Sequence, residues 1–264
     1  MAVDIDGTLL DNNDQITLKT KEAIKKGVEK GLIFTISTGR PVQGVQSIVK
    51  TLGLNFPVIT YNGAMVVMGE SFEILYEQKL SYEDAKSIIE LGMDYKTTVI
   101  VWNNNLVYAS PLNEKAINYS TISNIPPQAF KNAESFRDGA TKILWYDEVE
   151  TINEYSKKVG LLLSGNVNYH TSRPYFLEFV DQKASKAIAM ERLGEYFGIS
   201  REEMIAIGDG YNDLSMIEYA GLGVAMGNSP DDIKSKADFV TFTNDEDGVA
   251  HVIEKYILNI TKEV

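Results

Sequence analysis

The feature that most constrains the fold is an alternation of buried-strand and helix patterns at both ends of the chain. At the start, apolar runs at 1–3, 32–38 and 57–61 alternate with segments of helical periodicity between Thr17 and Gly31 and between Pro41 and Gly53. Threonine and proline are typical of helix starts and glycine of helix ends, so the boundaries agree with the pattern. Strand, helix and strand in succession predict parallel strands joined by crossover helices.

The middle of the chain has a different rhythm. From Ser81 onward hairpin and helix patterns are mixed, which predicts an inserted α+β module. The expected helices are 82–94, 113–123 and 148–159, and the expected strands lie near 97–110, 141–146 and 166–180.

The parallel pattern then resumes with a helix that Ser185 caps and with apolar strands at 204–207 and 223–226. Further on, Ser229 is expected to cap another helix, with Pro230 in its first turn. The predicted fold class is therefore α/β, with a parallel sheet that is split in sequence around an insertion.

Composition excludes several classes of function. The 264 residues carry 37 acidic against 25 basic side chains, which disfavours nucleic acid or an anionic membrane surface as the partner. No apolar run is long enough to span a bilayer, and the chain starts with acids where a signal peptide would be basic and then apolar, so we expect a cytoplasmic protein. Because there is no cysteine and only two separated histidines, any metal should be a hard cation on oxygen ligands.

Asp4 and Asp6 lie two residues apart at the end of the first predicted strand. Alternate side chains share a face, and open parallel sheets bind ligands at the carboxyl ends of their strands, so both carboxylates could converge on one site. Two carboxylates that close repel each other unless a divalent cation or a proton lies with them. The alternatives are solvated loop acids or an EF-hand loop, and the latter fails because its glycine and glutamate positions are not met.

Groups suited to binding an anion follow the second strand. Thr38, Gly39 and Arg40 place a hydroxyl, backbone N–H groups and a guanidinium there, and the helix expected from Pro41 would point its positive end at them. A polar turn that caps a helix explains the hydroxyl equally well. Lys186, at the start of a later helix, could also reach phosphate, although a lysine alone is more often a surface residue.

Two more acids, Asp209 and Asp213, follow another apolar strand. Four aspartates at strand ends in a chain without cysteine suit octahedral Mg²⁺. A dinucleotide site at Gly208 and Gly210 is excluded because no third glycine lies three residues further on.

Four segments in this order resemble the motifs of the haloacid dehalogenase superfamily: DIDGT at 4–8, STGR at 37–40, the helix-opening Lys186 and GDGYND at 208–213. The long insertion, the segment ITYNGA before it and the ending GVAMGNSPDDIKSKADFVT look like the Cof-type sugar-phosphatase subfamily. The resemblance covers essentially the whole chain.

The resemblance implies a Rossmann-like, doubly wound core over 1–81 and 183–264, a substrate-selecting α+β cap over 82–182, a Mg²⁺ cofactor and an aspartyl-phosphate intermediate. It implies that Asp4 is the nucleophile and that Asp6 protonates the leaving oxygen and later activates water. The implied metal ligands are Asp4, Asp6 through its backbone carbonyl, Asp209, and Asp213, which would act through water or orient Lys186. The implied phosphate- and substrate-binding residues are Thr38, Gly39, Arg40, Asn62, Lys186 and Asn212.

The leading hypothesis is a phosphatase that acts on a small phosphorylated metabolite such as a sugar phosphate, as a monomer or weak homo-oligomer. A sugar phosphomutase would use the same nucleophile and the same kind of cap. A phospho-acceptor or sensing module is an alternative of another class, and Asp6 argues against it because such a module needs no acid for a leaving group.

Overall fold

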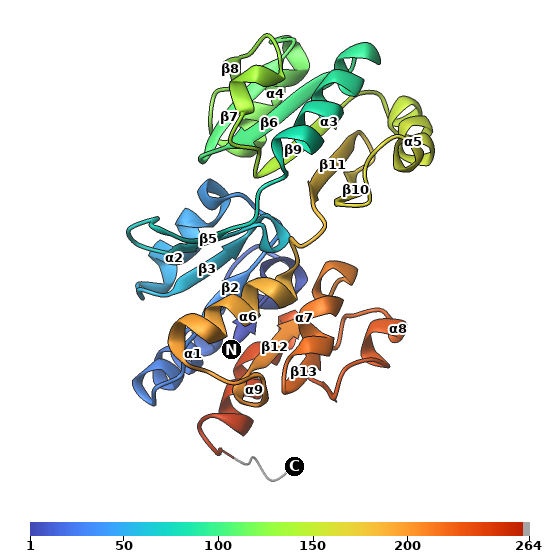
Figure 1. Cartoon of the computed structure of the whole chain (residues 1–264). Helices are drawn as coiled ribbons and strands as arrows, with labels where there is room; N and C mark the ends of the chain where they lie inside the picture. The colour runs from blue at the N-terminus through green and yellow to red at the C-terminus, as the bar shows by residue number, and fades with distance from the viewer. Residues whose placement is uncertain (261–264) are drawn as a thin grey trace. The chain divides into compact units, whose positions relative to one another are not determined.

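The computed structural model describes residues 1–260, which divide into two compact units. Within the described residues, the first unit comprises 1–39, 46–76 and 185–260, and the second comprises 40–45 and 77–184. The chain thus leaves the first unit and returns to it, and Figure 1 shows strands from both ends of the sequence in one sheet. The predicted boundaries of core and cap stay a prediction.

The first unit is built on a sheet with the strand order β14-β13-β12-β1-β2-β3-β4-β5. Its strands from β14 to β3 are parallel, and β4 joins in antiparallel orientation. The strands are β1 (Ala2–Val3), β2 (Thr35–Ser37), β3 (Pro57–Thr60), β4 (Met65–Met68), β5 (Ile74–Glu77), β12 (Ile205–Gly208), β13 (Leu222–Ala225) and β14 (Phe239–Val240). The α/β fold class predicted from the sequence is confirmed.

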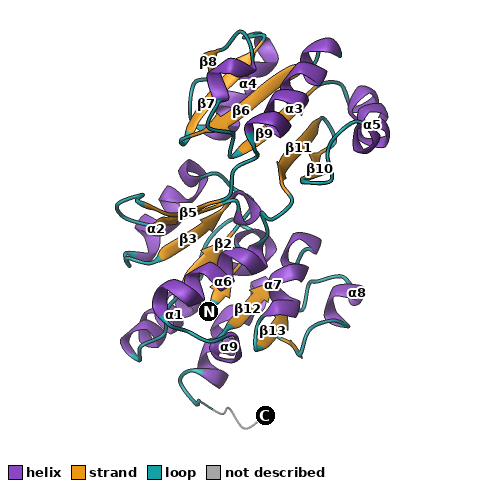
Figure 2. Cartoon of the chain, in the orientation of Figure 1, coloured by secondary structure: helices purple, strands orange, loops and turns teal. Residues whose placement is uncertain are grey.

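Both faces of this sheet are covered, because Ala2 and Val3 point to opposite faces of the central strand and both are buried. Side chains of α6 and α7 cluster with those of β1, β3 and β12, whereas α1 and α9 pack against each other. Figure 2 distinguishes the helices of this unit from its strands. The helices of the unit are α1 (Leu18–Glu29), α2 (Gln46–Leu52), α6 (Lys186–Phe197), α7 (Leu214–Tyr219), α8 (Asp231–Lys234) and α9 (Gly248–Tyr256).

The second unit has its own six-stranded sheet, with the order β10-β11-β9-β6-β7-β8. One buried cluster lies between this sheet and its helices and includes Trp145 and Phe179. The strands are β6 (Thr98–Asn103), β7 (Leu106–Ser110), β8 (Gln128–Ala129), β9 (Lys142–Tyr146), β10 (Val167–Arg173) and β11 (Phe176–Asp181). The helices are α3 (Tyr82–Asp94), α4 (Glu114–Ser123) and α5 (Val149–Lys158).

Two predicted helix starts are wrong. The segment after Pro41 is a 3-10 turn at Val42–Val45, with the Gly44 N–H bonded to the Pro41 carbonyl, and α2 begins only at Gln46. Glycine disfavours a continuous α-helix there. Ser229 does not cap α8, because Pro230 takes the extended cap conformation and leaves the serine hydroxyl buried without a hydrogen-bond partner.

None of the helices within residues 1–260 combines the length and the apolar composition that crossing a membrane requires.

Candidate active site

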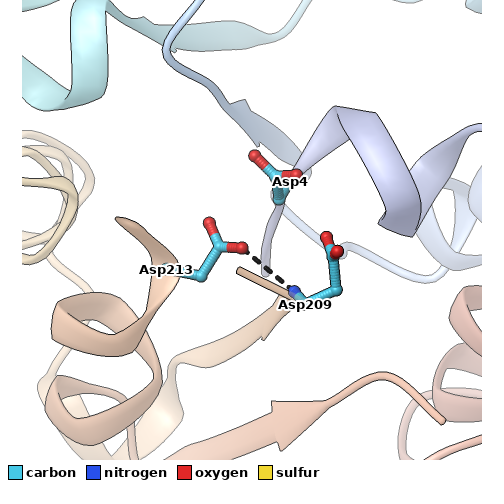
Figure 3. A group of neighbouring side chains, drawn as sticks. All are labelled: Asp4, Asp209 and Asp213. Carbon is cyan, nitrogen blue, oxygen red and sulfur yellow. Dashed lines mark hydrogen bonds between the residues drawn. The ribbon is translucent and has the colours of Figure 1, made fainter. Parts of the chain in front are cut away.

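The acids and the Thr38 turn gather at the carboxyl ends of three adjacent strands. Asp4 follows β1, Thr38 follows β2 and Asp209 follows β12, and the sheet order places β1 between the other two. The Asp4 N–H donates to the Ile207 carbonyl at 3.0 Å, which extends the strand pairing up to the carboxylate. Figure 3 shows the side chains of Asp4, Asp209 and Asp213 together at this edge. This is the place where open parallel sheets bind ligands.

Lys186 is the cation of the site. It is the first residue of α6, which Ser185 caps, and its side chain is fully buried. The ammonium Nζ donates to Asp4 Oδ1 at 2.6 Å, to Asp213 Oδ1 at 2.5 Å and to the Ser37 carbonyl at 2.8 Å. These contacts account for all three protons of the ammonium. Lys186 is therefore not the exposed surface lysine that residue statistics alone would favour.

A glycine brings Lys186 into this position. Gly63 has a φ of 99°, and a Cβ built on it would lie 2.1 Å from the Ser185 carbonyl oxygen. Only glycine permits such a backbone approach at positive φ. The loop after β3 thus contacts the start of α6 directly, which holds the first residue of the helix over the sheet edge.

Asp213 links the loop after β12 to the lysine. Its Oδ2 accepts the backbone N–H groups of Asp209 at 3.0 Å and of Gly210 at 2.8 Å, while Oδ1 accepts from Lys186. Gly208 makes room for this carboxylate, since a Cβ there would lie 2.4 Å from the Cβ of Asp213. The orienting role for Asp213 that the resemblance implies is consistent with these contacts.

Burial and like charges shift the ionisation of the site. Burial raises the pKa of Asp4 to about 7; the charges of Asp213 and Asp209 act in the same direction, and Lys186 opposes them. Burial also raises the pKa of Asp209. Burial alone would lower the pKa of Lys186, but the neighbouring carboxylates raise it, so the ammonium stays charged. The site therefore holds more acid than its single cation neutralises.

The donor set suits a hard divalent cation. Asp4, Asp209 and Asp213 each offer a carboxylate oxygen, and these oxygens lie within 4.8 Å of one another. All-oxygen ligands of this kind are what Mg²⁺ prefers, and a cation there would offset both the burial and the like-charge repulsion that raise the pKa of Asp4. Asp6 is exposed on the turn that follows β1.

The predicted substrate residues divide between the two units. Asn62 lies at positive φ beside Gly39, and its Oδ1 accepts from Asn212 Nδ2 at 3.3 Å. Thr38 is buried next to them, and its N–H donates to the Ile59 carbonyl at 2.9 Å. Arg40 belongs to the second unit, where its guanidinium donates to the Gly44 carbonyl at 3.3 Å.

Two residues that contact the candidate site were not predicted from the sequence. Thr8 Oγ1 donates to Asp209 Oδ1 at 2.8 Å, and Asn228 Nδ2 donates to the Gly7 carbonyl at 2.8 Å. Thr8 could have been found from its place in the DIDGT segment. Asn228 comes shortly after the strand predicted at 223–226. Its position at the carboxyl end of that strand could have indicated that it lies at the same sheet edge.

Comparisons with known proteins identify the family of the chain. The sequence matches the family of haloacid dehalogenase-like hydrolases over residues 1–253. It is 30% identical to the phosphatase YwpJ of Bacillus subtilis, covering 96% of this chain and 98% of that one. It is 29% identical to the 5-amino-6-(5-phospho-D-ribitylamino)uracil phosphatase YitU of the same organism, covering 97% and 96%.

Solved structures agree in fold. TM0651 from Thermotoga maritima is 31% identical with a TM-score of 0.86, covering 99% of this chain and 97% of that one. The subclass IIB sugar phosphatase BT4131 is 26% identical with a TM-score of 0.77, covering 97% of each chain.

Fold, site and comparisons together define a hydrolase of the phosphatase class. The chain belongs to the haloacid dehalogenase-like hydrolase family and is of the Cof type, as its motifs predicted.

Proposed function

We propose that the protein is a Mg²⁺-dependent phosphatase that hydrolyses a small phosphorylated metabolite, of the sugar phosphate class, through an aspartyl-phosphate on Asp4. The observation that carries the proposal is the buried ammonium of Lys186 between Asp4 and Asp213 at the carboxyl end of the sheet. A buried cation beside a carboxylate with room for a metal is what phosphoryl transfer requires, because its catalysis is mainly positioning and charge stabilisation.

The reaction has two steps. A carboxylate oxygen of Asp4 forms a bond to phosphorus while the bond from phosphorus to the leaving oxygen breaks, and that oxygen keeps the electron pair and takes a proton from Asp6. Asp6 then accepts a proton from water as the water oxygen attacks the phosphorus, and the bond between phosphorus and the Asp4 oxygen breaks, with the electron pair returning to the carboxylate. Inorganic phosphate leaves, and the Asp4 carboxylate and the Asp6 carboxyl are restored.

The other residues hold the phosphoryl group and the cofactor. Lys186, Thr38 and Asn212 would bind phosphoryl oxygens, with Gly39, Arg40 and Asn62 as further substrate contacts. Asp4, Asp209, Asp213 and the backbone carbonyl of Asp6 would hold Mg²⁺. When bound, the metal neutralises charge that otherwise repels the substrate from this acidic site.

The choice of substrate is assigned to the second unit, over the predicted cap 82–182. Two relatives support the sugar phosphate class: BT4131 is named as a sugar phosphatase, and YitU is named for a phosphoribitylamino-uracil. A screen of sugar phosphates, nucleotides and phosphorylated cofactors tests this assignment, and a preference for nucleotides would contradict it. Conversion of glucose 1-phosphate into the 6-phosphate faster than its hydrolysis would favour the mutase alternative.

The nucleophile is tested by Asp4→Asn with p-nitrophenyl phosphate as the substrate. We expect Mg²⁺-dependent release of phosphate by the wild-type protein and a loss of about 10³-fold or more in the variant, because an amide oxygen is a poor nucleophile. Asp14→Asn is the matched control, since Asp14 is exposed on the same loop, and it should keep wild-type activity. Retained activity in Asp4→Asn would exclude the proposed intermediate.

A further inference from the structure

Two asparagines from the C-terminal part of the chain hold the loop that follows Asp4. Asn228 lies in the loop after β13, and its side-chain amide forms hydrogen bonds on both sides. Its Nδ2 donates to the Gly7 carbonyl at 2.8 Å, and its Oδ1 accepts the backbone N–H of Asn244 at 3.1 Å. Asn228 thus connects the turn that carries Asp6 to a distant segment of the same unit.

Asn244 adds a second attachment further along this loop. It is buried, and its Nδ2 donates to the Leu10 carbonyl at 3.0 Å and to Asn12 Oδ1 at 3.3 Å. The two amides therefore act at different points: Asn228 on the turn itself and Asn244 on the residues behind it.

The turn is held from its other side by Asp209. Gly7 has a φ of 79°, and a Cβ on it would lie 2.5 Å from Asp209 Oδ2. The next residue, Thr8, donates to Asp209 Oδ1 at 2.8 Å. The Gly7 carbonyl belongs to the peptide between Gly7 and Thr8, so Asn228 holds this peptide directly, while Asp209 holds the hydroxyl of the adjoining Thr8 side chain. A rotation of this peptide would move Asp6, which precedes it.

We propose that Asn228 is a positioning residue that holds the Gly7–Thr8 peptide so that the Asp6 carboxyl points at the leaving oxygen. The inference rests on the proposed function, because it assumes that Asp6 donates a proton in the first step. Asn228 contacts no reacting atom and acts only through the turn.

The exposure of Asn228 makes it possible to distinguish a role in positioning Asp6 from a role in stabilising the fold. Asn228 is exposed, so its replacement should leave the melting temperature within about 2 °C of wild type. A change in catalysis without a change in stability then reports on the position of the turn.

The test compares two substrates of similar shape in Asn228→Ala and Asn228→Asp. Phenyl phosphate releases a more basic oxygen than p-nitrophenyl phosphate does, so its cleavage depends more on protonation by Asp6. The aspartate variant keeps an acceptor for the Asn244 N–H but cannot donate to Gly7. We expect both variants to lose about tenfold more kcat/KM for phenyl phosphate than for p-nitrophenyl phosphate, a part of the ~10²–10⁴-fold that a general acid supplies.

The control is Asn13→Ala. Asn13 is an exposed asparagine of the same loop whose backbone N–H donates to Asp11, so this variant should keep the wild-type kcat/KM for both substrates. Equal losses for the two substrates, or no loss, would overturn the role of Asn228. A wild-type protein that fails to release phosphate from p-nitrophenyl phosphate with Mg²⁺ would instead contradict the proposed function itself.

Discussion

The position of Asp4 illustrates how a proton and the proposed metal would compete for one carboxylate. Without a cation, burial raises its pKa to about 7, although Lys186 donates to it at 2.6 Å. At neutral pH the Asp4 carboxyl is therefore only partly ionised when no cation is bound. Because a metal binds the ionised carboxylate, proton and cation compete for the same oxygen.

The proposed binding of Mg²⁺ should consequently depend on pH in one direction. As the pH falls below about 7, Asp4 takes up a proton, and the Mg²⁺ concentration for half-maximal binding should rise by up to about tenfold per pH unit. Above that pH the dependence due to Asp4 should vanish. Calorimetric titrations with MgCl₂ between about pH 5.5 and 8.5 measure it. A half-saturation that stays constant over this range would contradict the shifted pKa.

The sequence placed Asp4, Asp209 and Asp213 at one sheet edge, because the ends of neighbouring parallel strands meet there, and the structure brings a carboxylate oxygen of each within 4.8 Å of the others. The role of Asp6 stays a prediction. Contacts between residues far apart in the chain could not be predicted in this way. The bond from Asn228 to Gly7 spans 221 residues, and no local pattern specifies which side chains meet across such a distance.

Helices and strands followed the local signals where those signals were strong. Thr17 and Ser185 cap α1 and α6 as predicted, because a hydroxyl that accepts a first-turn N–H needs only neighbouring residues. The start of α2 differed because Gly44 weakens the helix and because residues 40–45 belong to the second unit. Local patterns thus predicted the elements better than their ends.

The loop after β3 contacts the start of α6 through Gly63, and a substitution of Gly63 tests whether this contact positions the helix. An alanine there would meet the Ser185 carbonyl, so Gly63→Ala should lower the free energy of unfolding by about 2 kcal/mol or more. Activity should fall as well, since Lys186 moves with α6. Gly165→Ala is the matched control, because a Cβ there meets nothing within 4 Å. Urea unfolding measures the difference, and equal stability of both variants would show that α6 does not depend on this contact.

In the molecule as a whole, each unit buries an ion pair of its own. In the second unit Lys142 Nζ lies 3.0 Å from Glu178 Oε2, and Ser172 donates to the other oxygen at 2.8 Å. Burial alone would raise the pKa of Glu178, but the charges of Lys142 and His170, together with the hydrogen bonds from Ser172 and Lys142, lower that pKa. The pair therefore stabilises the second unit above the ordinary pKa of a glutamate, and this stabilisation is lost as the pH falls through the lowered value.

Breaking the ion pair between Lys142 and Glu178 should destabilise the second unit selectively. Glu178→Gln leaves the Lys142 ammonium buried without its counter-charge, and we expect a cost of about 3–5 kcal/mol. The double variant Lys142→Met, Glu178→Leu should recover most of it, because neither charge remains. Both tryptophans of the chain, Trp102 and Trp145, are buried in this unit, so their fluorescence during urea unfolding reports on it. Equal midpoints for wild type and Glu178→Gln would contradict the prediction.

The interruption of the first unit by the second has a consequence for synthesis. The ribosome delivers β1 and Asp4 first, then the complete second unit, and only afterwards α6 and β12. Because Asp4 and Lys186 are 182 residues apart, the second unit can fold on the emerging chain while the first is still incomplete. Until Lys186 has been synthesised, Asp4 lacks the ammonium that it contacts in the folded unit, so the proposed site can assemble only after the whole second unit has been made.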